Sequence, residues 1–259
     1  MTSFRTIASG SSGNAALLSC GGTHILIDMG ISCRRICGAL REAGLAPQDL
    51  SAVLITHEHT DHIAGLATYI KKYQTPIICS PGTSRQLRYR LAGIAPLLRS
   101  LPMEDTASVG EFSVTILPTS HDCSESAAFR IDTPDGSLGY LTDTGYIPEV
   151  TARRLLGTDL LVLESNHDVD KLRSGPYPYP LKQRVLGPNG HLSNDTAAQY
   201  AADSARAGTK AIILAHLSPE NNTPRLALDT VGQALAAIGY TGRLSAAPRD
   251  TGSELFRME

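Results

Sequence analysis

The chain has 259 residues, of which 42% are hydrophobic and 19% charged, a globular composition that excludes a disordered protein. Lys and Arg number 23 against 25 Asp and Glu, and the formal net charge of −2 excludes a uniformly basic protein that wraps nucleic acid. The sequence contains no apolar run of the roughly 18–20 residues that a bilayer span needs, and no secretory signal pattern. The five cysteines include no Cys-x-x-Cys pair and are expected to be reduced thiols. We expect one domain, residues 1–259, of a cytoplasmic protein that does not bind membranes.

Short strands and helices are expected to alternate in the first third of the chain. Strands are expected at 4–8, 15–19 and 24–28, the last an apolar run that ends in Asp28. A helix is expected after Ser32, since Gly44 and Pro47 provide its stop. Further strands are expected at 52–56 and 76–79, and helices at 63–73 and 81–91.

The second half of the chain again opens with strands and closes with helices. Strands are expected at 112–117, 127–132 and 137–142, the last after the turn Pro134-Asp135-Gly136. Two further strands at 160–164 and 211–215 are expected to alternate with helices that begin near Asn194 and Pro224. Two such halves are compatible with two sheets packed face to face with helices outside. Composition alone does not distinguish this arrangement from a doubly wound sheet.

Three of the eight histidines stand in one short string after the strand expected at 52–56. The string His57-Glu58-His59-Thr60-Asp61-His62 places two imidazoles at alternate positions, with a carboxylate and a third imidazole directly behind them. Imidazole and carboxylate groups are the ligands that Zn²⁺, Mn²⁺ and iron ions accept. A charged loop facing solvent is the alternative, but four potential ligands in so short a string favour two adjacent metal sites.

This string and four further segments resemble the metallo-β-lactamase superfamily over nearly the whole chain. The strand ending in Asp28 is similar to the first motif of that superfamily, and Ser120-His121-Asp122 is similar to the third. Asp143 and His216, each at the end of an expected strand, stand at the positions of two further ligands. The resemblance implies an α/β fold, the αβ/βα four-layer sandwich, with Asp28 as a buried carboxylate that orients the ligand loop.

The resemblance also implies a dinuclear metal centre built from seven ligands. One ion would be held by His57, His59 and His121, the other by Asp61, His62 and His216, with Asp143 shared between them. Two divalent ions, Zn²⁺ or Mn²⁺ with iron as a further option, lower the pKa of bound water from about 15.7 toward about 7 and so supply a hydroxide at neutral pH. The predicted reaction is therefore hydrolysis, with Asp61 assigned to catalysis as well as to metal binding.

Three segments are similar to those of phosphodiester-cleaving members of the superfamily. Glu164-Ser165-Asn166-His167-Asp168 and Gly190-His191-Leu192-Ser193-Asn194 resemble segments of tRNA 3′-processing endonucleases of the RNase Z type. That resemblance implies His191, before a helix, as general acid or transition-state stabiliser. His167 and Ser193 are expected to touch substrate. The small polar loop Ser9–Asn14 is expected to approach an anionic substrate through Ser11, Ser12 and Asn14. A helix-capping His191, a core His167 and a simple hairpin loop are the alternatives.

Taken together, the motifs most closely resemble the YycJ/WalJ family of bacterial exonucleases of the metallo-β-lactamase fold. The segments that carry this resemblance are Ser9–Asn14, Asp143–Tyr146, Glu164–Val169, Tyr177–Lys182, Gly190–Asn194 and Leu217–Asn222. The resemblance implies a 5′→3′ exonuclease that acts on DNA. In the fourth segment Tyr179 stands where we expect tryptophan, and either ring can stack on a base.

Nucleic-acid contacts are expected from basic residues close to these motifs, and DNA is favoured over RNA. The candidates are Arg85, Arg88 and Arg90 on one predicted helix, and Lys171, Arg173, Lys182 and Arg184 around the tyrosine-proline segment. The alternative is that they are solvated helix surfaces. Other functions also stay open: a small-molecule or cyclic-nucleotide phosphodiesterase, a ribonuclease of RNase Z type, a thioester hydrolase or a non-catalytic regulator. The sequence does not specify the oligomeric state.

Overall fold

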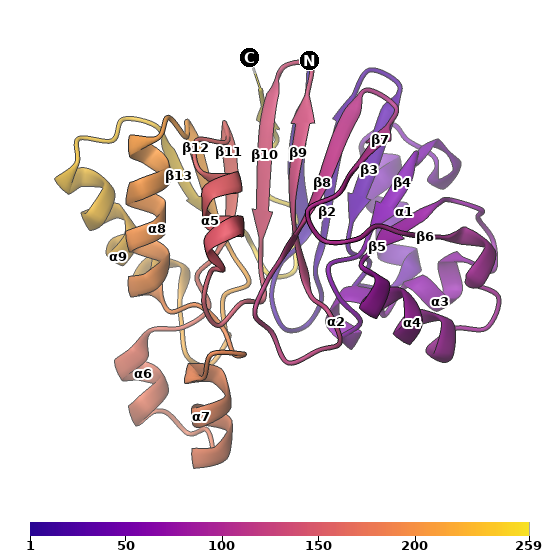
Figure 1. The fold of residues 1–259 in the computed structure, drawn as a ribbon. Helices are drawn as coiled ribbons and strands as arrows, with labels where there is room; N and C mark the ends of the chain where they lie inside the picture. Colours follow the sequence, from indigo (N-terminus) through magenta and orange to yellow (C-terminus); the bar gives the residue numbers. More distant parts are fainter. Residues whose placement is uncertain (259) are drawn as a thin grey trace.

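The computed structural model describes residues 1–258, in which two seven-stranded sheets pack face to face with helices on their outer faces (Figure 1). The first sheet has the order β14-β1-β2-β3-β4-β5-β6 and the second the order β13-β12-β11-β10-β9-β8-β7. The strands of the first sheet are β1 (Ser3–Ala8), β2 (Ala15–Cys20), β3 (Thr23–Ile27), β4 (Ala52–Leu54), β5 (Ile77–Cys79), β6 (Leu98–Ser100) and β14 (Phe256–Arg257). Those of the second are β7 (Thr106–Val109), β8 (Phe112–Pro118), β9 (Ala127–Thr133), β10 (Gly136–Leu141), β11 (Leu160–Glu164), β12 (Ala211–Ala215) and β13 (Arg243–Ala246).

Most helices of each half of the chain cover the sheet to which that half contributes most of the strands. The first half contributes α1 (Cys33–Glu42), α2 (Thr60–Ile63), α3 (Leu66–Tyr69) and α4 (Pro81–Arg90). The second half contributes α5 (Glu149–Leu155), α6 (Val169–Ser174), α7 (Tyr179–Leu186), α8 (Asn194–Arg206) and α9 (Pro224–Ala237). The pair α6–α7 extends beyond the sheets, at the end of the sandwich opposite to both chain termini (Figure 1). Among the described residues, no helix is long and apolar enough to span a bilayer.

Three apolar layers hold the sandwich together. The central layer lies between the sheets and contains the fully or almost fully buried rings of Phe4, Phe112 and Phe129. A second layer joins the first sheet to α1, α3 and α4, and a third joins the second sheet to α5, α8 and α9. The burial of apolar side chains on both faces of each sheet explains why strands such as β11 are apolar almost throughout. The four-layer α/β sandwich expected from the sequence is confirmed.

The helix expected at 63–73 is wrong, because the chain forms two short helices there, α2 and α3, separated at Gly65. The Gly65 amide donates a hydrogen bond to the Met29 carbonyl oxygen at 2.9 Å. A Cβ atom at Gly65 would overlap the Ile31 carbonyl oxygen, so the chain packs directly on the segment that follows β3. Strands β6, β7, β13 and β14 were not expected, because each is short and lies at or near a sheet edge with little apolar alternation.

Three strand ends direct carboxylate and imidazole groups toward one edge of the sandwich. Asp28, Asp143 and His216 follow β3, β10 and β12, and each has a positive φ, between 56° and 59°. Since this left-handed conformation costs a non-glycine residue about 1–3 kcal/mol, it persists only where the surrounding structure enforces it. Strands β10, β11 and β12 are mutually parallel, so their carboxyl ends share this edge.

We predict that Gly30→Ala destabilises the fold by at least about 2 kcal/mol, because an added Cβ atom at Gly30 would overlap the Asp61 carbonyl oxygen. The matched control is Gly38→Ala within α1, where a Cβ atom meets nothing within 4 Å. Alanine there should stabilise the helix by about 0.5–1 kcal/mol. Urea denaturation of both variants measures these changes. A Gly30→Ala protein as stable as the wild type would contradict the close packing described.

Candidate metal centre

The histidine string forms the connection after β4 and the first turn of α2. His57 and His62 are fully buried, whereas His59 is partly exposed. The loop therefore places three imidazoles at the edge where the strands of both sheets end. Residues from the second half of the chain approach the same place: His121 after β8, Asp143 after β10 and His216 after β12.

The first group of ligand atoms consists of three imidazole nitrogens. His57 Nε2 lies 3.0 Å from His59 Nδ1, and His121 Nε2 lies 3.3 Å from the same atom. All three nitrogens lie within 4.8 Å of one another. The second group consists of Asp61, His62 and His216, where Asp61 Oδ2 is 3.4 Å from His62 Nε2 and 3.5 Å from His216 Nε2.

Asp143 lies between the two groups and contacts both. Its Oδ1 is 3.8 Å from His121 Nε2 and 3.5 Å from His216 Nε2, and its Oδ2 is 3.3 Å from His62 Nε2. Asp143 Oδ2 and His216 Nε2 are buried and have no hydrogen-bond partner within residues 1–258. Buried polar atoms are rarely left unpaired, so these two atoms fit the ligands of a bound cation. The structure therefore brings all seven expected ligands together.

The pKa values of His57, His121 and Asp143 favour the forms that bind metal. Burial, reinforced by the nearby His62, lowers the pKa of His57 well below its usual value, and burial also lowers the pKa of His121. Burial alone would raise the pKa of the Asp143 carboxyl, but the imidazoles of His216 and His62 outweigh it and hold this pKa well below its usual value. Neutral imidazoles and ionised carboxylates are the forms that coordinate metal ions. The carboxylates of Asp28 and Asp143 outweigh burial and raise the pKa of His62, and Asp143 is the main cause of a raised pKa for His216.

Asp28 orients the ligand loop, as the resemblance implies. Its side chain is fully buried, and its Oδ2 lies 2.8 Å from His62 Nδ1. The Thr56 amide donates to Asp28 Oδ1 at 2.9 Å. Because Nδ1 of His62 is engaged by this carboxylate, Nε2 is directed toward Asp61 and Asp143. A carboxylate behind a histidine in this way fixes the ring and its tautomer.

Glu164 makes the same kind of contact to two histidines, a role that the sequence analysis did not assign. Its Oε1 lies 2.7 Å from His191 Nδ1 and 3.1 Å from His216 Nδ1, while its Oε2 accepts from the Thr144 amide at 2.9 Å. Burial alone would raise the pKa of this carboxyl, but the imidazoles of His191 and His216 lower it to about 2. The sequence offered one sign of this role, which is that Glu164 is a charged residue at the end of the otherwise apolar strand β11.

Glu58 and Asn14 support the ligand loop from either side. Glu58 is buried; its Oε1 accepts from the Ser124 amide at 2.9 Å, which joins the histidine string to the segment that follows His121. Asn14 is buried as well, and its Nδ2 lies 3.1 Å from His62 Nε2 and 3.4 Å from Asp61 Oδ2. The substrate contact expected for Asn14 stays a prediction, since the contacts present here are with ligand residues.

Of the other residues expected to touch substrate, one lines the cavity beside the histidine cluster and three do not. Ser11 lines the cavity beside His121 and His216, whereas Ser12 is exposed outside its lining. His167 is almost completely buried, and burial lowers its pKa to about 4. Ser193 caps α8 by accepting from the Thr196 amide at 3.2 Å. Neither His167 nor Ser193 is among the residues that line the cavity, so both roles stay predictions.

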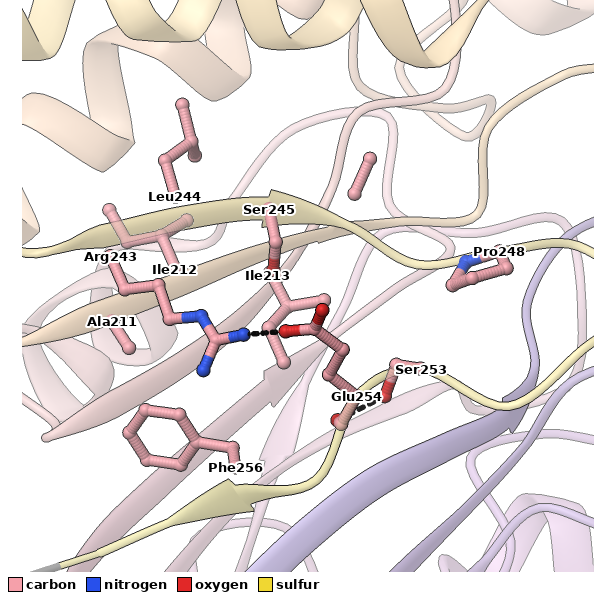
Figure 2. Close-up of a pocket in the computed structure, with 11 residues that line it drawn as sticks. Ala211, Ile212, Ile213, Arg243, Leu244, Ser245, Pro248, Ser253, Glu254 and Phe256 are labelled. Atoms are coloured by element: carbon pink, nitrogen blue, oxygen red, sulfur yellow. Dashed lines mark hydrogen bonds and ion pairs between the residues drawn. The ribbon is translucent and has the colours of Figure 1, made fainter.

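A cavity of about 160 Å³ opens beside the histidine cluster, lined by His121, His191 and His216. Tyr177, Leu181 and Arg184, from α7 and the turn before it, form another part of its wall. A larger cavity of about 410 Å³ lies between β12, β13 and the C-terminal segment, where Arg243 and Glu254 form an ion pair (Figure 2). No imidazole or aspartate lines it, so none of the expected site residues lies there.

Comparisons with known proteins agree with this geometry. Residues 23–217 match the family described as "Beta-lactamase superfamily domain". Exodeoxyribonuclease YycJ of Bacillus anthracis is 34% identical over 92% of this chain and 90% of its own length. Exodeoxyribonuclease WalJ of Streptococcus pneumoniae is 34% identical over 97% and 96%. Ribonuclease Z of Mycobacterium bovis is 27% identical over 95% and 91%.

A solved structure shows the same fold with a more distant sequence. The metallo-β-lactamase fold protein YhfI of Bacillus subtilis superposes with a TM-score of 0.73, at 19% identity, covering 98% of this chain and all of that one. The matches extend over both sheets and all the ligand-bearing strand ends. The chain therefore belongs to the β-lactamase superfamily and, within it, to the family of the YycJ and WalJ exodeoxyribonucleases.

Proposed function

We propose that this protein is a metal-dependent phosphodiesterase that degrades DNA from the 5′ end. The observation that supports this most directly is the meeting of two ligand groups at Asp143, beside a cavity that His191 also lines. The relatives named as exodeoxyribonucleases support the choice of DNA. Two Mn²⁺ or Zn²⁺ ions are the proposed cofactors, and a cytoplasmic location is proposed with them.

The seven residues assigned to the ions are His57, His59 and His121, then Asp61, His62 and His216, with Asp143 between the groups. When bound, two divalent ions supply a water nucleophile at neutral pH and stabilise charge on the phosphate. Because the ligands come from both halves of the chain, we propose that residues 1–259 act as one domain. Asp28 holds His62 in place through Nδ1 of that histidine, and Glu164 holds His216 in the same way.

His191 is the proposed general acid. Its Nδ1 contacts the Glu164 carboxylate. Its ring is partly exposed at the cavity and stacks on the ring of His216, with 5.3 Å between the two ring centroids. The free Nε2 is thus available to a group in the cavity. A histidine backed by a carboxylate can donate a proton to a leaving oxygen, which contributes roughly 10²–10⁴-fold to the rate.

The first test is a time course on 5′-phosphorylated, 3′-labelled duplex DNA with Mn²⁺. We expect fragments that shorten progressively from the 5′ end, and no cutting by Asp61→Ala, because this change removes a ligand of the second group. A matched RNA and a cyclic dinucleotide are incubated in parallel. Intact DNA with a cleaved cyclic dinucleotide or RNA would overturn the proposal.

The metal content provides a second prediction. We expect two divalent ions per chain by elemental analysis, one in His59→Ala, and weakened binding of both ions in Asp143→Ala, since Asp143 contacts both groups. His24→Ala is the matched control, because His24 lies in β3 outside the cluster. Two tightly bound ions in the Asp143→Ala protein would rule out a shared ligand.

The role of His191 can be separated from general stabilisation of the phosphate. His191→Ala should lower kcat on DNA by about 10²–10⁴-fold without loss of metal. The loss should nearly vanish for a p-nitrophenyl phosphodiester of thymidine, because p-nitrophenolate leaves without protonation. If kcat falls equally on both substrates, His191 stabilises the transition state and is not the acid.

A further inference from the structure

The exposed aromatic side chains of the described residues lie on segments next to the metal centre. They are Tyr89, Tyr146 and Tyr179, exposed by 90%, 53% and 73%. We call these three residues the tyrosine surface. Most apolar side chains of this protein are buried, and a single exposed ring would need no explanation. Three exposed rings on three segments that contact ligand-bearing loops do need one.

Each segment of the tyrosine surface is attached to a loop that carries proposed ligands. Tyr89 precedes Arg90, whose Nη1 donates to the Glu58 carbonyl oxygen at 2.6 Å. Tyr146 follows Asp143 by three residues, and the Gly145 amide before it donates to the Ser120 carbonyl oxygen at 2.8 Å.

Tyr179 begins α7, which is joined to the segment of His121 by an ion pair. Arg184 Nε on this helix lies 2.5 Å from Asp122 Oδ2. Figure 1 shows α4 and α6–α7 at the same end of the sandwich as α2, on either side of the ligand-bearing loops. The three rings thus lie on segments that contact the ligand-bearing loops.

Positive charge is concentrated on the same elements. Helix α4 and the segment from α6 to α7 contain seven basic residues and one acidic residue, whereas the rest of the chain contains 16 basic and 24 acidic residues. Arg85, Arg88, Arg173 and Arg184 are exposed. Rings beside arginines are the combination that binds single-stranded nucleic acid, because every base has a stacking face and every nucleotide a phosphate. A protein partner would not require this charge.

We propose that the tyrosine surface stacks the unpaired bases of the DNA strand whose backbone enters the metal centre. This inference rests on the proposed function. It adds that the DNA entering the centre is single-stranded, so the strand is separated from its complement before it is cut. A duplex would then be attacked through a frayed or overhanging end. Base stacking on one ring corresponds to about a 5- to 150-fold gain in affinity.

Two fluorescent strands of equal charge test this. A twelve-nucleotide thymidine strand and an abasic strand of the same length, both with cleavage-resistant phosphorothioate links, are titrated with metal-loaded protein by anisotropy. We expect the wild type to bind the thymidine strand at least about 10-fold more tightly. Tyr179→Ala and Tyr89→Ala should each reduce that ratio about 5-fold or more, while Tyr179→Phe keeps it. Arg225→Ala on α9, outside these elements, should keep it too.

The outcomes separate this inference from the proposed function. Two results would show that the tyrosine surface does not stack bases while leaving the nuclease assignment intact. In one, the wild type degrades DNA but binds the thymidine and abasic strands equally. In the other, both alanine variants keep the full ratio of the two affinities. If a uridine strand binds more tightly than the thymidine strand, the assignment of the surface to DNA is overturned. If DNA stays intact in the time course above, the proposed function fails, and the stacking surface loses its substrate.

Discussion

The burial of carboxyl groups among imidazoles at one edge of the sandwich is the constraint on which the rest of this structure depends. Asp28, Asp143 and Glu164 are buried, and each contacts at least one histidine. A buried carboxylate is costly unless it is paired and hydrogen-bonded, so the surrounding groups must be held in place. Two sheets that pack on a shared apolar core provide that rigidity, because the strands ending at this edge cannot move independently.

The two ring nitrogens of His62 and His216 have different partners. Asp143 lies near their Nε2 atoms. Asp28 contacts Nδ1 of His62, and Glu164 contacts Nδ1 of His216. Glu164 contacts both His216, a proposed ligand, and His191, which lines the cavity. One carboxylate thus couples the orientation of the metal ligands to that of the proposed acid. Loss of this contact would affect metal affinity and proton transfer together.

The region proposed to bind the DNA strand lies outside this centre. The family fold and the ligand set are compatible with several phosphodiesters, but one wall of the cavity is formed by α7, and the pair α6–α7 carries the exposed side chains of Tyr179, Arg173 and Arg184. The Arg184–Asp122 pair attaches these helices to the segment of His121. The proposed metal centre and the proposed stacking surface therefore lie on different elements that share a few contacts.

Much of the fold was predictable from sequence because the buried strands are apolar runs bounded by turn residues, as at 160–164 and 211–215. The sequence did not predict β6, β7, β13 and β14, since sheet edges need little apolar surface and are held mainly by pairing with a neighbour. It also predicted one helix where Gly65 divides two, because a close approach between backbones distant in sequence has no local signature.

The sequence by itself determined the ligand types and their order, since imidazole and carboxylate chemistry is a property of the residues themselves. The resemblance assigned them to two ions. Only the tertiary structure decided which histidines Glu164 contacts, which segment Glu58 holds, and that Asn14 contacts His62 and Asp61. It also decided that Tyr89, Tyr146 and Tyr179 are exposed. The physical reason is that these contacts join segments far apart in the chain. Which of them meet depends on the packing of the two sheets.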